Sequence, residues 1–214
     1  VIAKLPEPYP YLAVLACDGD DMSQKAKSLG FDAHRSLSKS LSDFAKQVGK
    51  IIESPALGNG SLIYSGGEDV LAFLPLDRVL PSVQALRDLF QRKVRIEGDP
   101  CTVSFGIAVV HMLIPMVGDM VRYALDSERE AKNPVMHFDE RTLMALGEQA
   151  LAEAKSQEKN SLSIHLYKRS GSPTKVRLPW IDQVDQRFDP VPRMLEWISL
   201  LKQEWVSHRT AFAL

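Results

Sequence analysis

Apolar residues along the chain fall into blocks whose spacing predicts a sheet with amphipathic helices. Tyr11-Leu-Ala-Val-Leu-Ala-Cys17 is a continuous apolar run, as expected of a central strand covered on both faces. Between Asp32 and Glu53 apolar residues recur every three or four positions, which predicts a long amphipathic helix. Two short apolar runs follow at 61–65 and 70–74, and the glycine pair between them indicates a β-hairpin.

A second amphipathic helix is predicted over 76–94, and a long strand over 101–110. The order up to this point is strand, helix, strand, strand, helix, strand. That order is typical of the ferredoxin-like βαββαβ fold, in which the helices cover one face of an antiparallel sheet. The sequence therefore predicts an α+β domain whose first and third strands are neighbours in the middle of the sheet.

The pattern after residue 111 is less regular. It predicts helices over 117–131 and 140–154, a fifth strand over 162–167 and a final apolar helix over 191–212. The last helix is more apolar than a solvated tail needs to be, and we expect it to pack on something outside this chain.

A Ser-Gly-Ser-Pro segment at 170–173 marks a predicted boundary. We therefore expect one domain over 1–171. A C-terminal helical segment over 172–214 would belong to a further domain.

Two acidic clusters stand at predicted strand ends. Asp18 ends the first strand, and Glu68-Asp69 belongs to the turn of the hairpin. Because the first and third strands are neighbours, these carboxylates are expected within a few ångströms of each other. An acidic turn is often only a solvated loop, but clustered carboxylates repel unless a cation neutralises them. Hard oxygen ligands of this kind suit Mg²⁺ or Mn²⁺, and two such ions can assist phosphoryl transfer.

Composition narrows the class of protein without fixing it. Twenty-six Lys and Arg residues against 27 Asp and Glu leave a formal net charge of −1, so a strongly basic nucleic-acid clamp is not indicated. The two cysteines, Cys17 and Cys101, lie in apolar runs and are expected to be buried thiols. No apolar run approaches the roughly 18 residues of a membrane span. We expect a cytoplasmic protein.

The acidic motifs and their surroundings resemble a known family. The segments Tyr11-Leu-Ala-Val-Leu-Ala-Cys-Asp-Gly-Asp-Asp-Met22, His34-Arg35, Tyr64-Ser-Gly-Gly-Glu-Asp69 and Ser104-Phe-Gly-Ile-Ala-Val-Val-His111 are similar to the large polymerase-like subunit of type III CRISPR effector complexes, of the Cmr-like subtype. The resemblance spans roughly residues 10–171. It implies a palm domain that converts ATP into cyclic oligoadenylate within a complex of further subunits, crRNA and target RNA.

The resemblance also implies roles for individual residues. Asp18, Glu68 and Asp69 would be the catalytic acids that ligand two divalent ions, Mg²⁺ or Mn²⁺, with help from the Gly19 carbonyl. The triphosphate would contact main-chain groups just after the first strand, at Asp20, Asp21 and Met22. The nucleotide would lie against the hairpin turn, at Ser65, Gly66 and Gly67. Lys155 or Lys132 would contact the triphosphate, and Lys155 is favoured because Asn160-Ser-Leu follows it as the next strand begins.

Two departures from the family pattern bear on this interpretation. The family hairpin is usually Gly-Gly-Asp-Asp, whereas Glu68 stands at the third position here. Glutamate reaches one methylene further and remains a carboxylate ligand. The stretch between His111 and Leu162 is longer than the pattern requires, which indicates an insertion or lengthened helices.

Two other functions stay open at this stage. One is a non-catalytic palm kept as a scaffold in the same ribonucleoprotein. The other is a diguanylate cyclase, which would use GTP, although the Arg-x-x-Asp signature upstream of the hairpin is missing. The first residue, Val1, and the missing His-Asp nuclease motif lead us to expect a piece of a larger protein.

Overall fold

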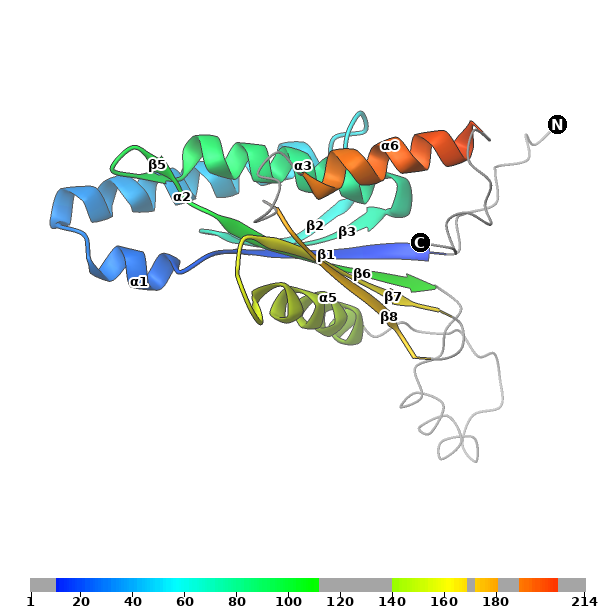
Figure 1. The fold of residues 1–214 in the computed structure, drawn as a ribbon. Coiled ribbons are helices and arrows are strands. Elements are labelled where there is room, and N and C mark those ends of the chain that lie inside the picture. Colours follow the sequence, from blue (N-terminus) through cyan, green and yellow to red (C-terminus); the bar gives the residue numbers. More distant parts are fainter. Residues whose placement is uncertain (1–10, 112–139, 169–171, 181–188, 204–214) are drawn as a thin grey trace, which may run out of the picture.

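A computed structural model describes residues 11–111, 140–168, 172–180 and 189–203. Its main feature is a six-stranded sheet in the order β2-β3-β1-β6-β7-β8 (Figure 1). The strands of this sheet are β1 (Tyr11–Gly19), β2 (Ser61–Gly66), β3 (Asp69–Pro75), β6 (Val103–His111), β7 (Ser161–Tyr167) and β8 (Thr174–Pro179). The helices are α1 (Met22–Lys27), α2 (Phe31–Ile52), α3 (Leu76–Lys93), α5 (Glu140–Lys155) and α6 (Pro190–Lys202). A short separate hairpin joins β4 (Arg95–Ile96) and β5 (Asp99–Pro100).

The first four strands of the large sheet confirm the predicted βαββαβ order. In the part β2-β3-β1-β6, every neighbouring pair is antiparallel, with β1 and β3 side by side. Helices α2 and α3 cover one face of this part (Figure 1). The α+β palm-like architecture expected from the sequence is therefore present.

The apolar spacing of α2 explains how it covers the sheet. Its buried residues recur at intervals of seven and four positions, which places them on one side of the helix: Leu37, Phe44, Val48 and Ile52. Phe44 meets Phe90 of α3 edge to face, with 5.0 Å between ring centroids. This packing holds α2 against α3, and α2 also contacts strand β2 of the hairpin.

The sheet continues beyond the ferredoxin-like part in a way that the sequence did not predict. Strand β7 lies parallel to β6, and α5 connects to it from the opposite face of the sheet (Figure 1). The helices thus cover both faces and not one. Helix α5 sits close to β6 because Gly106 has no side chain: a Cβ there would overlap the Leu151 backbone. The helix predicted over 117–131 lies outside the described residues.

The segment after the predicted boundary joins the same sheet. Strand β8 was not predicted, and it pairs antiparallel with β7. Trp180, which follows it, is buried against Phe105 of β6 with ring centroids 5.7 Å apart. The division at residue 171 stays a prediction, but the sheet extends past it.

Helix α6 packs on this chain as well. Val191 is fully buried, and Met194 and Leu195 pack against the core next to α3. Trp197 and Ile198 on the same helix are exposed. Within the described ranges, no helix is long and apolar enough to cross a lipid bilayer.

Candidate functional site

The register of β1 and β3 brings two of the predicted acids together. Cys17 pairs with Val70, so the next residues along the two strands are Asp18 and Asp69. Glu68, in the turn next to Asp69, lies close to the end of β1. A Cβ at Gly19 would meet the Glu68 Cβ at 3.0 Å and the Met22 Cγ at 2.6 Å. Glycine at position 19 thus allows the hairpin turn to rest on β1.

The proximity of the acids changes their protonation. Partial burial, the charge and hydrogen bond of Asp18 and the charge of Glu68 together raise the pKa of Asp69 to about 6. Lys155, at the end of α5, opposes this rise. The site therefore carries more negative charge than its own cations neutralise.

Lys155 lies directly on the first acid. Its ammonium forms an ion pair with the Asp18 carboxylate and donates a hydrogen bond of 3.2 Å to the Gly19 carbonyl. Of the two lysines considered in the sequence, Lys155 is thus the one placed at the acids, while Lys132 lies outside the described residues. Its contact with a triphosphate stays a prediction.

Asp20 is a buried carboxylate that joins three parts of the chain. It is 1% exposed, accepts a hydrogen bond of 2.7 Å from the Ser104 hydroxyl, and accepts one of 2.9 Å from the Asn160 amide. Its own amide donates to the Thr102 carbonyl at 2.9 Å. Both its side chain and its amide are therefore engaged within the protein, which makes Asp20 a structural member of the motif in this structure.

The next two residues also separate into different roles. Asp21 is exposed, adopts a left-handed conformation with φ of 58°, and forms an ion pair with Lys159. The hydrogen bond from Lys159 lowers the pKa of Asp21. Met22 is buried in the core at the start of α1.

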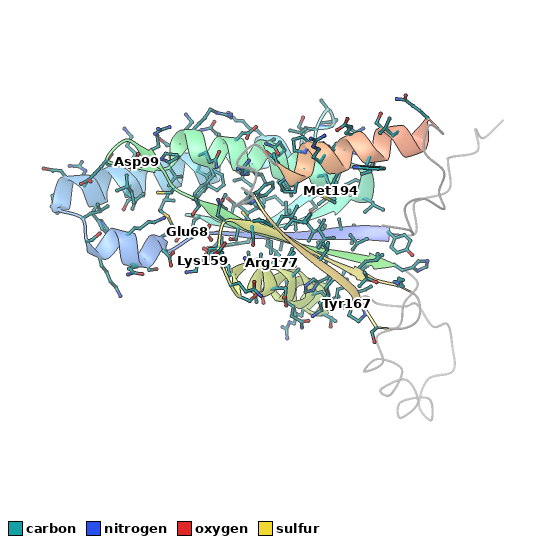
Figure 2. The ribbon with its side chains drawn as sticks, in the orientation of Figure 1. Glu68, Asp99, Lys159, Tyr167, Arg177 and Met194 are labelled. Atoms are coloured by element: carbon teal, nitrogen blue, oxygen red, sulfur yellow. The ribbon has the colours of Figure 1, made fainter. Side chains whose placement is uncertain are left out.

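Lys159 is a site residue that the sequence analysis did not single out. The usable signal was its spacing of four from Lys155, just before β7. Figure 2 places Lys159 and Glu68 at the end of the sheet where β1 runs into α1. Lys155 at the end of α5 and Lys159 in the turn before β7 thus pair with Asp18 and Asp21 at the end of β1.

The hairpin borders an open cavity of about 590 Å³ on the α2 side. Three predicted site residues of the hairpin line this cavity: Ser65, Gly66 and Gly67. The rest of the lining comes from α2, namely Ser38, Leu41, Ser42, Ala45 and Lys46. The Ser65 hydroxyl donates to the Ala45 carbonyl of α2 at 3.2 Å. Gly67 has φ of 62°, a conformation that favours glycine.

The oxygens gathered here are of the type that hard divalent cations prefer. Two adjacent carboxylates, Asp18 and Asp69, lie beside the Gly19 carbonyl, with Glu68 next to them. Among the residues that the structure describes, no three His, Cys, Asp or Glu side chains converge as a ready-made metal site. A cation at this place would draw on main-chain oxygen and require a movement of Lys155 or Glu68.

A mixed sheet, antiparallel over β2-β3-β1-β6, with paired acids at the end of its central strand and a glycine hairpin beside them, defines a palm-type α+β domain. Residues 11–136 match the family model described as Cas10/Cmr2, second palm domain. The chain belongs to this family, which confirms the resemblance inferred from its acidic motifs.

Among curated proteins, the chain is 27% identical over 201 residues to the CRISPR system Cmr subunit Cmr2 of Pyrococcus furiosus. The match covers 79% of this chain and 20% of that protein. The chain thus spans about a fifth of the length of the curated relative it matches.

Two kinds of solved structure are among those similar to this chain. The active GGEEF domain of a diguanylate cyclase from Vibrio cholerae has a TM-score of 0.46 at 17% identity, covering 75% of this chain and 85% of that one. The apo Csm1–Csm4 cassette has a TM-score of 0.46 at 16% identity, covering 71% of this chain and 20% of that one.

Proposed function

We propose that this chain is a metal-dependent nucleotidyltransferase palm of a type III CRISPR effector subunit and converts ATP into cyclic oligoadenylate. The observation that carries the proposal is the pairing of Asp18 with Asp69 at the end of the central strands, beside a hairpin that borders a cavity. Membership of the Cas10/Cmr2 palm family supports it. Partner subunits, crRNA and target RNA belong to the same proposal.

The acids are suited to hold divalent cations. Asp18, Asp69 and the Gly19 carbonyl offer hard oxygen ligands, and Glu68 can reach the same place with its longer side chain. Bound Mg²⁺ or Mn²⁺ would activate a hydroxyl and stabilise the pyrophosphate leaving group. No covalent nucleophile is required, so the role of the protein residues is positioning and charge stabilisation.

The cavity beside α2 is suited to a nucleoside. Its volume of about 590 Å³ lies within the usual range for small-molecule sites. The Ser38 and Ser65 hydroxyls donate to main-chain carbonyls and can still accept a hydrogen bond from the amino group of adenine. The Ser42 hydroxyl can donate to the adjacent ring nitrogen. None of the lining residues carries a carboxylate, the acceptor favoured by the two neighbouring donors of guanine. This lining favours ATP over GTP.

The lysines of the α5–β7 connection are suited to the phosphates. Lys155 and Lys159 approach the end of β1 from one side, and each is paired with an aspartate. Both side chains are long enough to turn from a carboxylate to a phosphate oxygen. We assign the triphosphate to this side of the hairpin.

The test is product formation by the full chain and by its assembled complex with target RNA. Each is incubated with Mn²⁺ and labelled ATP or GTP, using wild type, Asp69→Ala and, as a control, Asp77→Ala on α3. We expect cyclic adenylate products that are lost with Asp69→Ala and kept with Asp77→Ala. Absence of product from the complete RNA-bound complex would establish the scaffold function instead. A guanosine product from the chain alone would establish a diguanylate cyclase.

A further inference from the structure

Lys155 contacts the same two oxygens that a divalent cation would use. We propose that Lys155 is an internal counter-ion that competes with metal for Asp18 and the Gly19 carbonyl, and that a bound triphosphate relieves this competition. Metal and nucleotide then bind cooperatively, each weakly without the other. The inference rests on the proposed function and concerns how metal and nucleotide bind to its site.

The contacts of Lys155 carry the first step. Its ammonium touches the Asp18 carboxylate and lies 3.2 Å from the Gly19 carbonyl oxygen. The side chains of Lys155 and Asp18 are only 21% and 34% exposed, so the pair is partly shielded from water. An ammonium in this position and a cation bound to the same oxygens exclude each other, by volume and by charge.

The main chain of Lys155 is fixed, so the competition is decided by its side chain. The carbonyl of the preceding residue, Ala154, accepts hydrogen bonds from the Ser161 hydroxyl at 2.5 Å and from Arg177 Nε at 3.2 Å. One turn earlier, α5 rests on Gly106 without space for a Cβ. The helix end therefore stays in place when the ammonium leaves Asp18.

One lysine does not neutralise the acids it faces. Asp18, Glu68 and Asp69 together carry up to three negative charges, whereas in the described part of the chain the one ammonium that pairs with any of them is that of Lys155, on Asp18. The acids thus retain attraction for a cation of higher charge. Displacement of Lys155 is disfavoured when its ammonium loses its partner, and favoured when a phosphate oxygen takes the place of Asp18 as that partner.

This exchange of partners links two binding events. A metal ion alone must leave the Lys155 ammonium without its carboxylate, whereas a metal ion with a triphosphate supplies the ammonium with a new anion. Linkage requires the effect to be reciprocal, so metal strengthens nucleotide binding by the same factor as nucleotide strengthens metal binding.

The test measures Mn²⁺ binding to the full chain at pH 8, by the electron paramagnetic resonance signal of free Mn²⁺. Three proteins are compared, with and without a non-hydrolysable ATP analogue: wild type, Lys155→Met and Lys159→Met. The Lys159 variant is the matched control because it removes the same charge four residues away but leaves the Asp18 contact intact. Thermal unfolding checks that all three are folded.

Without nucleotide, we expect Lys155→Met to bind Mn²⁺ on the order of tenfold more tightly than wild type, and Lys159→Met to gain much less. With the analogue, we expect wild type to gain Mn²⁺ affinity and Lys155→Met to lose most of that gain. Equal Mn²⁺ affinity in Lys155→Met and Lys159→Met would overturn the inference.

The outcome also separates the inference from the proposed function. If wild type and both variants bind no Mn²⁺ even with the analogue, the metal site itself is wrong, and the inference falls with it. If wild type binds Mn²⁺ and forms product but Lys155→Met binds no more tightly, the function stands and only the counter-ion role is wrong.

Discussion

Asp69 has a carboxylate whose charged form the folded chain disfavours. Partial burial and the neighbouring Asp18 raise its pKa from 3.8 to about 6, so the unfolded chain ionises it at lower pH than the folded chain does. Between these two values the folded state binds more protons than the unfolded state. Stability therefore falls as the pH rises through this window and is lowest above it.

Replacing Asp69 with asparagine removes this effect. We expect Asp69→Asn to unfold at a higher temperature than wild type at pH 7.5 in the absence of divalent cations, and the difference to shrink below pH 4. The measurement is thermal unfolding followed by circular dichroism across this pH range. Asp77→Asn, on the surface of α3, is the control and should show no such trend. A lower unfolding temperature of Asp69→Asn at pH 7.5 would contradict the charge repulsion described here.

The sequence predicted the acid pair but not the separate roles within Asp18-Gly-Asp-Asp. The pair follows from topology alone, because neighbouring strands of known order bring their ends together. Nothing in a run of three aspartates and one glycine indicates that Asp20 is buried while Asp21 is exposed. That difference depends on Ser104 and Asn160, which are 84 and 140 residues away from Asp20.

Asp20 joins three elements at one end of the sheet. Its carboxylate connects the end of β1 to Ser104 on β6 and to the Asn160 amide just before β7. Asn160 itself has φ of 54°, and Lys159 precedes it. The bond to Asn160 thus fixes the turn that holds Lys159 and follows Lys155.

Truncating Asp20 should loosen this turn. We expect Asp20→Ala to destabilise the chain by about 3 kcal/mol, because two donors lose a buried charged acceptor. Hydrogen exchange of the Asn160 amide should accelerate. Chemical denaturation and exchange monitored by mass spectrometry measure the two effects. Asp21→Ala is the matched control, and its exposed ion pair with Lys159 should matter much less. Equal effects of the two variants would show that Asp20 does not act as a clamp.

At the level of elements, long periodic segments were predicted well and short or edge elements were not. The helix expected over 32–53 is α2, and the strand over 162–167 is β7. Helix α1 has only six residues and one buried side chain, Met22, so it has no periodicity to detect. Strand β8 follows Pro173 and has no buried residue, so its place at the sheet edge comes from pairing with β7 and not from an apolar pattern.

At the scale of the whole molecule, the C-terminal segment is held to the palm by a buried contact. Arg87 of α3 forms an ion pair of 3.1 Å with Asp189, and its guanidinium lies 4.5 Å from the centroid of the Trp180 ring. The sequence did not predict this contact, because Arg87 and Asp189 are 102 residues apart. Helix α6, which the sequence led us to expect on a surface outside this chain, instead packs its first turn against the core of the palm.

Removing the indole should test whether this segment and the palm unfold together. We expect Trp180→Ala to destabilise the whole described fold by about 3–5 kcal/mol, in a single cooperative transition. Trp197→Ala is the control, because Trp197 on α6 is 44% exposed and its loss should change stability little. Unfolding is followed by circular dichroism and by hydrogen exchange of β6. A separate early transition of the C-terminal segment in wild type would instead support an independent domain.

The ion pair between Asp18 and Lys155 spans 137 residues of sequence. Contacts between such distant residues require most of the intervening chain to be in place, and they form slowly. During synthesis from the N-terminus, the acid-bearing strands emerge well before the helix that supplies their lysine. A partly made chain therefore presents these acids without Lys155, and the arrival of α5 at β6 is the folding step that brings this ammonium to Asp18.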